Sequence, residues 1–471
     1  LTTYAQNGDN ILRLNNMSSY APHLAGVFWV ILGVQFPLLL SQDLSDSFDA
    51  ISDLLLHNEF EKAEALLRNF PNSPQVGAFK GDIAFRKGHF IEAHNHYSLT
   101  LNQEPGNARA HFGLGKLALG KMRIKEAVQY LTRAVELAPD EPLYRLTAAE
   151  ALGIDKDLEE QERQLVAYLE LEPTYNPDRV AEVEAALEVI QGFGSDRMGI
   201  YNIGESQQPV PIAKAVNLIF AKVMIGERGP FEFLVDTGAS QTIFTQKLVG
   251  QLDLTPITNT LVHGIGGDGQ VETSIYRIDQ FTFGDIEVQN LPVGAMSDPL
   301  LSEIAEGIFS MATFSDHVVT IDYPQSRIEF NATEQADVDT IPAWFFYNLV
   351  LVPLGINGIH EGLFLLDTGA VTTVVSHSLA ATLGVDQDTP GATIDLGLAG
   401  IAGFGGTVLR VDDITLRTPK NREEYSYVVA IDMREISNML GTEVSGILGY
   451  DFLENYRLAI DFQKAEVRLF R

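Results

Sequence analysis

The sequence predicts a multidomain chain: an all-α region of helical repeats, followed by an all-β region made of two related lobes. Two internal repetitions support this prediction. Between about residues 75 and 175, one pattern of small, aromatic and proline residues recurs every 34 positions. In the second half, Phe233–Ser240 recurs as Phe364–Val371, an offset of 131 positions (367 − 236). Repetition at a fixed offset indicates that one structural unit is built more than once.

The composition narrows the range of functions. The 471 residues suffice for two to four domains of about 100–200 residues each. The formal net charge of −31 argues against binding to nucleic acid, because a phosphate backbone requires a basic surface. An anionic membrane surface is disfavoured for the same reason. The chain contains no cysteine, which excludes disulfides, thiolate metal ligands and a cysteine nucleophile.

The N-terminal region holds one long apolar stretch, Leu24–Leu40. A membrane-spanning helix needs about 20 apolar residues, whereas the core of a secretory signal usually has about 7–15. If translation begins at Met17, the segment Met17–Ser41 has the length of such a signal, although residues 17–23 lack Lys and Arg. A buried helix is the alternative. We expect residues 1–42 to be a signal peptide or membrane anchor, and the protein to be exported, either periplasmic or membrane-anchored outside the cytoplasm.

The next region, residues 43–195, shows helical periodicity. In its best-defined unit the apolar residues form one stripe of an α-helix, at Ile124, Ala127, Val128, Leu131, Ala134 and Val135. Prolines recur at 105, 139 and 173, where each would end a helix pair. The histidines within Gly88–His96 lack the His-Glu-x-x-His spacing that places two imidazoles on one helical face, so we expect no metal site there.

This region resembles the tetratricopeptide repeat family from about residue 75 to 175, with a degenerate unit around Ala50–Pro71. The family's usual Trp near the start of each repeat is missing. The resemblance implies stacked helix pairs with a concave face that binds a protein or peptide partner. A scaffold that binds nothing is the alternative.

Two β-lobes are predicted after a linker. Residues 196–211 are expected to be this linker because Gly, Ser and Pro are frequent there. Short β-type runs separated by turn residues follow. Matching pieces recur in the same order in residues 212–335 and 336–471, which we expect to be lobe 1 and lobe 2. These pieces are Phe233–Ser240 with Phe364–Val371, Gly307–Ser310 with Gly446–Gly449, and Val319–Tyr323 with Leu458–Phe462.

Each lobe carries Asp-Thr-Gly-Ala after three apolar residues, beginning at Asp236 and at Asp367. Burying one ionised carboxylate is costly, and burying two together is costlier. If the lobes pack about a pseudo-twofold axis, the two carboxylates meet there, share one proton and titrate in coupled steps. One then acts as general base on water while the protonated partner polarises a carbonyl. We expect this pair to be catalytic, with no metal and no cofactor.

The residues that follow each Asp favour the same chemistry. A threonine hydroxyl in each motif can brace the two turns against each other, and a glycine lets backbone N–H groups approach the carboxylate. We therefore expect six residues to support the active-site loops: Thr237, Gly238, Ala239, Thr368, Gly369 and Ala370.

A glycine-rich segment follows each motif, within His263–Gly269 and Gly400–Gly406. Glycines supply positive φ and flexibility at hairpin tips. We interpret these segments as flaps over bound substrate, with ordinary turns as the alternative. The candidate flap and substrate-binding residues are Gly264, Ile265, Gly266, Gly267, Ile401, Gly403 and Phe404.

Residues 212–471 resemble the retropepsin-like and pepsin-like aspartic peptidases. The matched residues are Asp236–Ala239, Asp367–Ala370 and the apolar-apolar-Gly element Ile447–Gly449. His263–Gly269 is similar to the flap of the retroviral enzymes, which build their site from two chains, whereas pepsins use two lobes of one chain. The resemblance implies an endopeptidase that cleaves protein or peptide substrates with an Asp236/Asp367 dyad, as a monomer with an internal pseudo-twofold axis.

Three features depart from the family pattern. Ser310 stands where lobe 1 should have the glycine of the apolar-apolar-Gly element, and Tyr276 does not match the flap tyrosine of pepsins. Ala239 and Ala370 replace the Ser or Thr that pepsin-like enzymes usually have. Because the loss of a donor to the anion raises its pKa, we expect activity at weakly acidic to neutral pH.

Two alternative functions stay open. In one, the peptidase fold no longer cuts and the protein binds partners through its repeats; Ser310 is the feature that favours it. In the other, each lobe pairs with its twin in another chain, although tethering within one chain makes internal pairing less costly in entropy. If the repeats present a protein substrate, deleting residues 43–195 should impair cleavage of folded proteins more than that of short peptides.

Overall fold

The computed structural model describes residues 47–55, 57, 59–171, 177–194, 200–203, 208–263, 270–332, 338–394 and 408–471. The described residues divide into two units, one ending at Glu59 and the other comprising Phe60–Arg471. In the first unit, residues 47–55 are helical. The apolar residues 24–40, which carry the export prediction, lie outside the described residues. Within the described part of the chain, no helix reaches the length and apolarity that crossing a bilayer requires.

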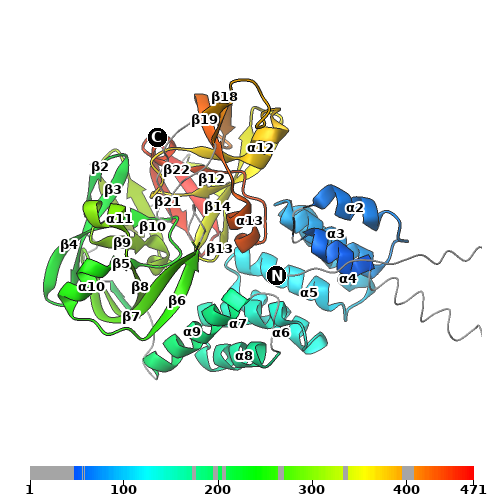
Figure 1. Ribbon diagram of the computed structural model, residues 1–471, viewed down its shortest axis with the longest axis horizontal. Coiled ribbons are helices and arrows are strands. Elements are labelled where there is room, and N and C mark those ends of the chain that lie inside the picture. Colours follow the sequence, from blue (N-terminus) through cyan, green and yellow to red (C-terminus); the bar gives the residue numbers. More distant parts are fainter. Residues whose placement is uncertain are drawn as a thin grey trace, which may run out of the picture. The chain divides into compact units, whose positions relative to one another are not determined.

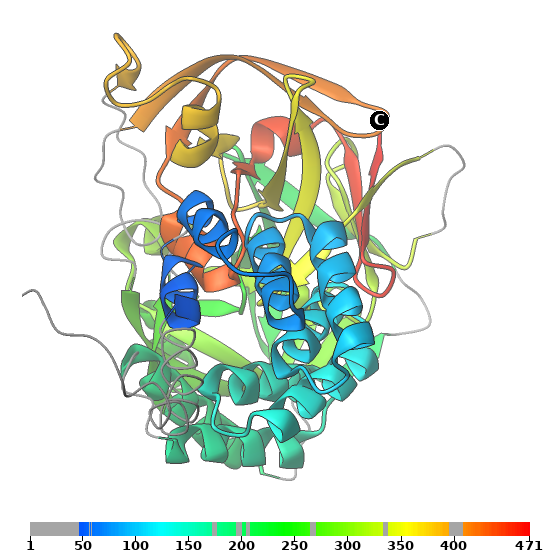
Figure 2. The ribbon, with the colours of Figure 1, turned by 90° about the vertical axis from the view of Figure 1, so that its right-hand side faces the viewer.

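The unit Phe60–Arg471 begins with helices that pack in successive pairs (Figure 1). Seen from the side, they form a curved row (Figure 2). Pro105 and Pro139 directly follow two of these pairs, as the 34-residue spacing predicts. The helices are α2 (Phe60–Leu67), α3 (Pro74–Arg86), α4 (Phe90–Gln103), α5 (Ala108–Gly120), α6 (Ile124–Leu137), α7 (Pro142–Ile154), α8 (Leu158–Glu170) and α9 (Pro177–Phe193).

Close approach of paired helices explains the small residue that recurs in the repeats. A Cβ on Gly81 would lie 2.4 Å from the Tyr97 ring, and one on Gly115 would lie 2.6 Å from Cγ of Leu131. In both pairs, the glycine of the first helix makes room for a large side chain of the second. Tyr97 and Leu131 are both fully buried. The predicted helix-pair packing is therefore confirmed.

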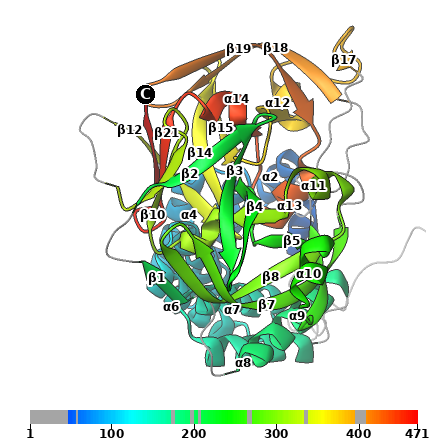
Figure 3. The same ribbon diagram turned by 90° about the vertical axis from the view of Figure 1, so that its left-hand side faces the viewer.

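Strands dominate the rest of the chain (Figure 3). Lobe 1 contains β2 (Val210–Ala215), β3 (Leu218–Ile225), β4 (Arg228–Asp236), β5 (Ile243–Thr245), β6 (Thr258–His263), β7 (Gln270–Phe283), β8 (Ile286–Met296), β9 (Gly307–Ser310), β10 (Val318–Asp322) and β11 (Arg327–Phe330). Lobe 2 contains β12 (Asp339–Pro342), β13 (Trp344–Phe346), β14 (Leu349–Ile356), β15 (His360–Leu366), β16 (Val374–Ser376), β17 (Thr393–Ile394), β18 (Val408–Arg417), β19 (Arg422–Ile431), β20 (Gly446–Leu448), β21 (Arg457–Asp461) and β22 (Glu466–Phe470).

The lobes also carry short helices that the all-β expectation did not include. These are α10 (Gln246–Leu252), α11 (Pro299–Ile304), α12 (His377–Thr382), α13 (Arg434–Leu440) and α14 (Tyr450–Leu453). A further strand, β1 (Ile200–Ile203), lies in the segment expected to be a linker and pairs antiparallel with β8. The segment between repeats and lobes thus contributes to the sheet of lobe 1, because β8 offers it backbone hydrogen-bonding partners.

An approximate twofold axis relates the two lobes. β4 pairs in parallel with β9, and β15 pairs in parallel with β20 in the equivalent register. β10 of lobe 1 pairs antiparallel with β21 of lobe 2, where Thr320 faces Ala459. These two residues are equivalent in the sequence repeat, 139 positions apart (459 − 320). The axis therefore passes through this strand pair, and the predicted fold class, helical repeats followed by a double-lobed β-region, is confirmed.

The helical repeats pack directly on lobe 2. Phe85 contacts Phe346 edge to face, and Phe90 packs at a tilt against Trp344 and Phe346, with ring centroids 4.1–5.9 Å apart. The hydroxyl of Thr442 donates to the Phe85 carbonyl at 3.0 Å. One cluster of buried apolar side chains includes residues of both regions. The repeats and lobe 2 therefore share a hydrophobic core.

Candidate active site

Asp236 and Asp367 lie at equivalent ends of two central strands. Asp236 is the last residue of β4, and Asp367 directly follows β15. The parallel neighbour of each strand, β9 or β20, supports it from behind. Asp236 is 6% exposed and Asp367 is 9% exposed. Both carboxyls are therefore shielded from bulk water but still have accessible surface.

The two carboxyl groups contact each other across the axis through a side-chain hydrogen bond. Within each loop a backbone N–H donates to the carboxyl: Gly238 N to Asp236 Oδ1 at 2.7 Å, and Gly369 N to Asp367 Oδ1 at 2.8 Å. A Cβ on Gly238 would lie 2.5 Å from the Asp367 carboxyl, and one on Gly369 would lie 2.6 Å from Asp236 Oδ2. Glycine is therefore required for each loop to approach the opposite carboxyl.

Thr237 and Thr368 link the two loops. Thr237 N donates to Thr368 Oγ1 at 3.1 Å, and Thr368 N donates to Thr237 Oγ1 at 3.0 Å. Each hydroxyl also donates to a carbonyl of the opposite lobe, Thr237 to Leu366 at 2.8 Å and Thr368 to Val235 at 2.7 Å. Both threonines are buried. These four hydrogen bonds fix the relative position of the two carboxyls.

Replacing Thr368 by valine is expected to loosen this link. Valine keeps the shape but leaves the Thr237 N–H and the Val235 carbonyl without their partner, at a cost of about 1–3 kcal/mol for each buried group. Thr368→Ser keeps the hydroxyl and is the matched control. We expect Thr368→Val to lower both the thermal unfolding midpoint and kcat/KM, and Thr368→Ser to stay close to wild type. Equal behaviour of the two variants would contradict the assigned bonds.

The environment of the pair favours the retention of one proton. Burial raises the pKa of Asp236, whereas hydrogen bonds from Asp367 and from the Gly238 N–H lower it. Burial raises the pKa of Asp367 well above its usual range, and the neighbouring Asp236 charge raises it further. Two carboxyls this close titrate as a pair. The arrangement thus offers one general base and one general acid at the same pH.

Ser310, the residue that departs from the family pattern, takes part in holding the lobe 1 loop. In lobe 2, Gly449 occupies the equivalent position, and the next residue donates its backbone N–H to the loop: Tyr450 N to Ala370 O at 2.8 Å. In lobe 1, the Ser310 hydroxyl donates to Ala239 O at 2.6 Å. The serine thus supplies, from its side chain, the hydrogen bond that the backbone supplies in lobe 2.

The remaining sequence candidates lie apart from this pair or outside the described residues. Gly264, Ile265, Gly266, Gly267, Ile401, Gly403 and Phe404, the candidate flap residues, fall outside the described residues. The strands that flank the first of these segments, β6 and β7, pair antiparallel. Tyr276 is buried in the core of lobe 1. In the described part of the chain, no group of three or more His, Asp or Glu side chains is arranged to hold a metal ion.

Two further residues hold the active-site loops and were missed in the sequence. Asp451 Oδ1 accepts hydrogen bonds from the backbone N–H and the hydroxyl of Thr373, both at 2.7 Å. Asn348 Nδ2 donates to the carbonyl of Ser240 at 3.0 Å. Asp451 follows the apolar-apolar-Gly element by two positions, a spacing that could have drawn attention to it. No pattern in the sequence marks Asn348.

Two family models match the chain. The aspartyl protease model matches residues 221–312 and 352–452, and the tetratricopeptide repeat model matches residues 84–151. A curated relative, the tetratricopeptide repeat-containing protein trd-1 of Caenorhabditis elegans, is 31% identical over 113 residues. That match covers 23% of this chain and only 14% of the relative's length.

A solved structure of an aspartic proteinase from Irpex lacteus is also similar. It shares 13% sequence identity with this chain, at a TM-score of 0.37. The similar part covers 56% of this chain and 97% of that one. The two family matches and the architecture described above therefore agree: residues 84–151 are similar to the tetratricopeptide repeat family, and residues 221–312 and 352–452 are similar to the aspartyl protease family.

Proposed function

We propose that this protein is an aspartic-type endopeptidase that hydrolyses peptide bonds with a water molecule activated by Asp236 and Asp367. The observation that supports this most is the hydrogen-bonded pair of buried carboxyls on the axis between the lobes. The N–H groups of Gly238 and Gly369 and the linked threonines keep that pair in place. A purely structural role would not need two carboxyls in so costly a position.

The chemistry follows from the single shared proton. The ionised carboxyl takes a proton from water, whose oxygen attacks the carbonyl carbon of the scissile peptide bond. The protonated carboxyl donates a hydrogen bond to the carbonyl oxygen, where negative charge develops. The tetrahedral intermediate then collapses as the leaving nitrogen receives a proton from the dyad. The free carboxylic acid and amine leave, and the pair again holds one proton.

The substrate and setting belong to the same proposal. We expect a protein or peptide substrate, and a monomer in which both carboxyls come from one chain. The repeats are proposed to bind a protein substrate or partner on the part of their surface that lobe 2 does not cover. Export, either to the periplasm or to an outward-facing membrane anchor, rests on residues 24–40 and stays a prediction.

The pH dependence of peptide cleavage tests the proposed function. Below the lower apparent pKa of the pair both carboxyls are protonated and no base remains, whereas above the upper one both are ionised and no acid remains. Because burial raises the pKa of both residues, we expect kcat/KM to be bell-shaped, with its maximum at weakly acidic to neutral pH. The measurement is cleavage of a denatured protein mixture from pH 3 to pH 8.

The result of this cleavage measurement distinguishes an active peptidase from a protein that only binds partners. A maximum well below pH 4 would contradict the expected pKa values. No cleavage of a broad substrate mixture at any pH would favour a protein that binds partners without cutting them. Cleavage that is blocked by a statine-type inhibitor would support the dyad directly, because such a compound mimics the tetrahedral intermediate.

A further inference from the structure

Two equivalent hairpin turns, one in each lobe, have different surroundings. The turn between β13 and β14 is Tyr347–Asn348, with φ of 50° and 66°. Its counterpart between β2 and β3 is Val216–Asn217, with φ of 48° and 60°. Two consecutive positive φ values define a type of hairpin turn that favours Asn and Gly, and a bulky aromatic or β-branched first residue is unfavourable there.

The helical repeats contact the β13–β14 hairpin of lobe 2, mainly along β13. A Cβ on Gly120 would lie 2.6 Å from the Phe346 ring, so a glycine is needed for the end of α5 to pack this closely against β13. Lys121 Nζ donates to the Ala343 carbonyl at 2.7 Å and lies 4.1 Å from the centroid of the Trp344 ring. These contacts hold both the start and the end of β13.

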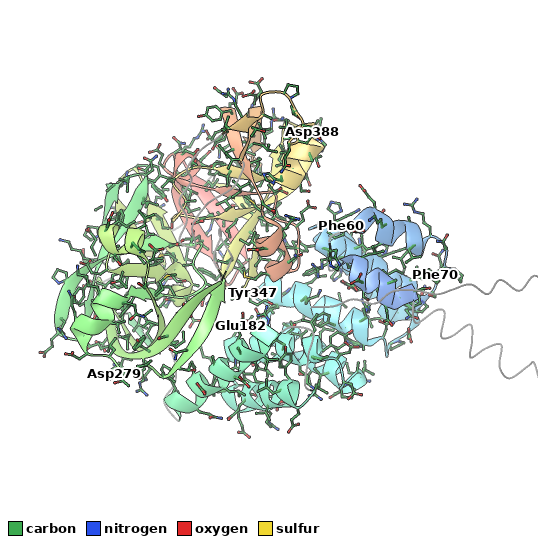
Figure 4. The ribbon with its side chains drawn as sticks, viewed as in Figure 1. Phe60, Phe70, Glu182, Asp279, Tyr347 and Asp388 are labelled. Atoms are coloured by element: carbon green, nitrogen blue, oxygen red, sulfur yellow. The ribbon has the colours of Figure 1, made fainter. Side chains whose placement is uncertain are left out.

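The repeats also hold the tip of the hairpin. Glu150 of α7 lies beside the turn, because it lines one small pocket together with Tyr347 and Asn348. Burial raises the pKa of Glu150 to about 7, while Arg179 and the Tyr347 N–H favour its charged form. Arg179 is itself paired with Glu182 on α9 at 2.7 Å. Figure 4 shows Tyr347 where lobe 2 meets the repeat helices, near Glu182.

On its other side, the same turn reaches the active-site loop of lobe 1. Asn348 Nδ2 donates to the Ser240 carbonyl at 3.0 Å. Ser240 lies four positions after Asp236. The intervening loop is otherwise fastened by Thr237, bonded to Thr368, and by Ala239, which accepts the Ser310 hydroxyl. Asn348 therefore supplies the last of three successive attachments of this loop.

We propose that Asn348 is a positioning residue for the active-site loop of lobe 1, and that the helical repeats set its position by holding the β13–β14 turn through Glu150. The repeats thereby become part of the machinery that places Asp236, in addition to any partner they bind. The kinetic consequences rest on the proposed peptidase function, whereas the effect on the loop itself does not.

The counterpart turn provides an internal control. Val216 is 69% exposed. Among the described residues, the side chain of Asn217 makes no hydrogen bond to the carbonyl of Val371, the residue equivalent to Ser240. The chain thus contains the same turn twice, once attached to an active-site loop and once not. In the described part of the chain, the repeats hold the hairpin of the attached turn through Glu150 and Lys121.

The test compares Asn348→Gly with Asn217→Gly in the full-length protein. Glycine adopts positive φ without steric cost, so both variants should keep the turn. Asn348→Gly removes a hydrogen bond to the active-site loop, whereas Asn217→Gly does not. We expect hydrogen exchange of the amides of residues 237–241 to become about fivefold faster in Asn348→Gly, the effect of one lost hydrogen bond. A misplaced catalytic carboxylate should lower kcat about tenfold, with KM little changed. Asn217→Gly should match wild type in both.

A third variant tests the link to the repeats. Glu150→Ala should change loop exchange and kcat in the same direction as Asn348→Gly, and the double variant should be no worse than Asn348→Gly alone, because both changes act through one contact. Additive effects, or wild-type exchange in Asn348→Gly, would overturn the proposal. If the wild type cleaves no substrate, the peptidase function fails, while the exchange measurement still decides the role of Asn348.

Discussion

Replacing Asp367 by asparagine is expected to abolish peptide hydrolysis and to leave a more stable protein. The amide fits the space of the carboxyl, but it can neither hold the shared proton as an acid nor accept it as a base. General acid–base groups contribute about 10²–10⁴-fold to rates. Because the two carboxyls act as one unit, we expect kcat/KM to fall by about 10³-fold or more. Initial rates on a peptide that the wild type cleaves measure this loss.

The gain in stability follows from the sign of the pKa shift. Burial, and then the Asp236 charge, raise the pKa of Asp367 above its value in the unfolded chain. Above about pH 4 the folded protein therefore binds more protons than the unfolded one, so its stability falls as the pH rises toward the raised pKa, by about 1.4 kcal/mol per pH unit for each extra proton. Asp367→Asn lacks this loss. Its advantage in unfolding free energy over wild type should grow from pH 4 upward in chemical denaturation.

Asp298→Asn is the matched control. Asp298 is as buried as Asp367, at 8% exposure, and its Oδ1 accepts the Leu301 N–H at 2.7 Å at the start of α11. Asparagine caps a helix about as well as aspartate, so this variant should keep wild-type activity. Retained activity in Asp367→Asn, or equal loss in both variants, would contradict the assignment of Asp367.

Replacing Phe346 by alanine is expected to destabilise the protein strongly, because this residue joins the repeats to lobe 2. Phe346 is buried and contacts Phe85 and Phe90 of the repeats. Removing a buried phenylalanine side chain costs about 3–5 kcal/mol. Thermal and denaturant unfolding should show a single transition at lower temperature or denaturant concentration. Ile91→Ala, at a position 81% exposed, is the control and should change little.

The core shared by the repeats and lobe 2 also changes the expected effect of deleting the repeats on cleavage. The sequence alone predicts that removal of residues 43–195 impairs cleavage of folded proteins more than that of short peptides. The shared core predicts loss of cleavage of both substrates, because the deletion would expose Trp344, Phe346 and Leu363 on lobe 2. Normal cleavage of short peptides by the truncated protein would show that lobe 2 does not depend on this core.

The pairing of the two carboxyls follows from the sequence because it depends on repetition. Two copies of Asp-Thr-Gly at strand ends imply equivalent positions, and an antiparallel pair of equivalent strands brings those positions together. The threonine link follows for the same reason, since each residue contacts its own equivalent. The helix pairs likewise follow from a local period, in which Gly81 and Tyr97 meet because they belong to neighbouring helices.

Contacts between parts of the chain that are not copies of each other produce no repeat in the sequence, so they could not be predicted from it. The apolar periodicity of α5 does not predict that Gly120 packs against Phe346, because an interface between a helix and a distant strand is not repeated elsewhere in the sequence. The hydrogen bond from Asn348 to Ser240 joins residues 108 positions apart, and its counterpart turn lacks the bond. Ser310 shows the converse limit: the sequence marks a departure from symmetry, but the hydrogen bond that its hydroxyl makes to Ala239 becomes visible only in the folded structure.

The most direct measurement is hydrolysis by wild type, by Asp236→Asn, by Asp367→Asn and by an equimolar mixture of the two variants, at the pH of highest wild-type activity. A dyad formed within one chain predicts cleavage by wild type alone, with both variants and their mixture inactive. Activity in either single variant would mean that two copies of one lobe form the site, and activity restored in the mixture would mean that the lobes pair between chains. Either result would contradict a single-chain dyad of Asp236 and Asp367.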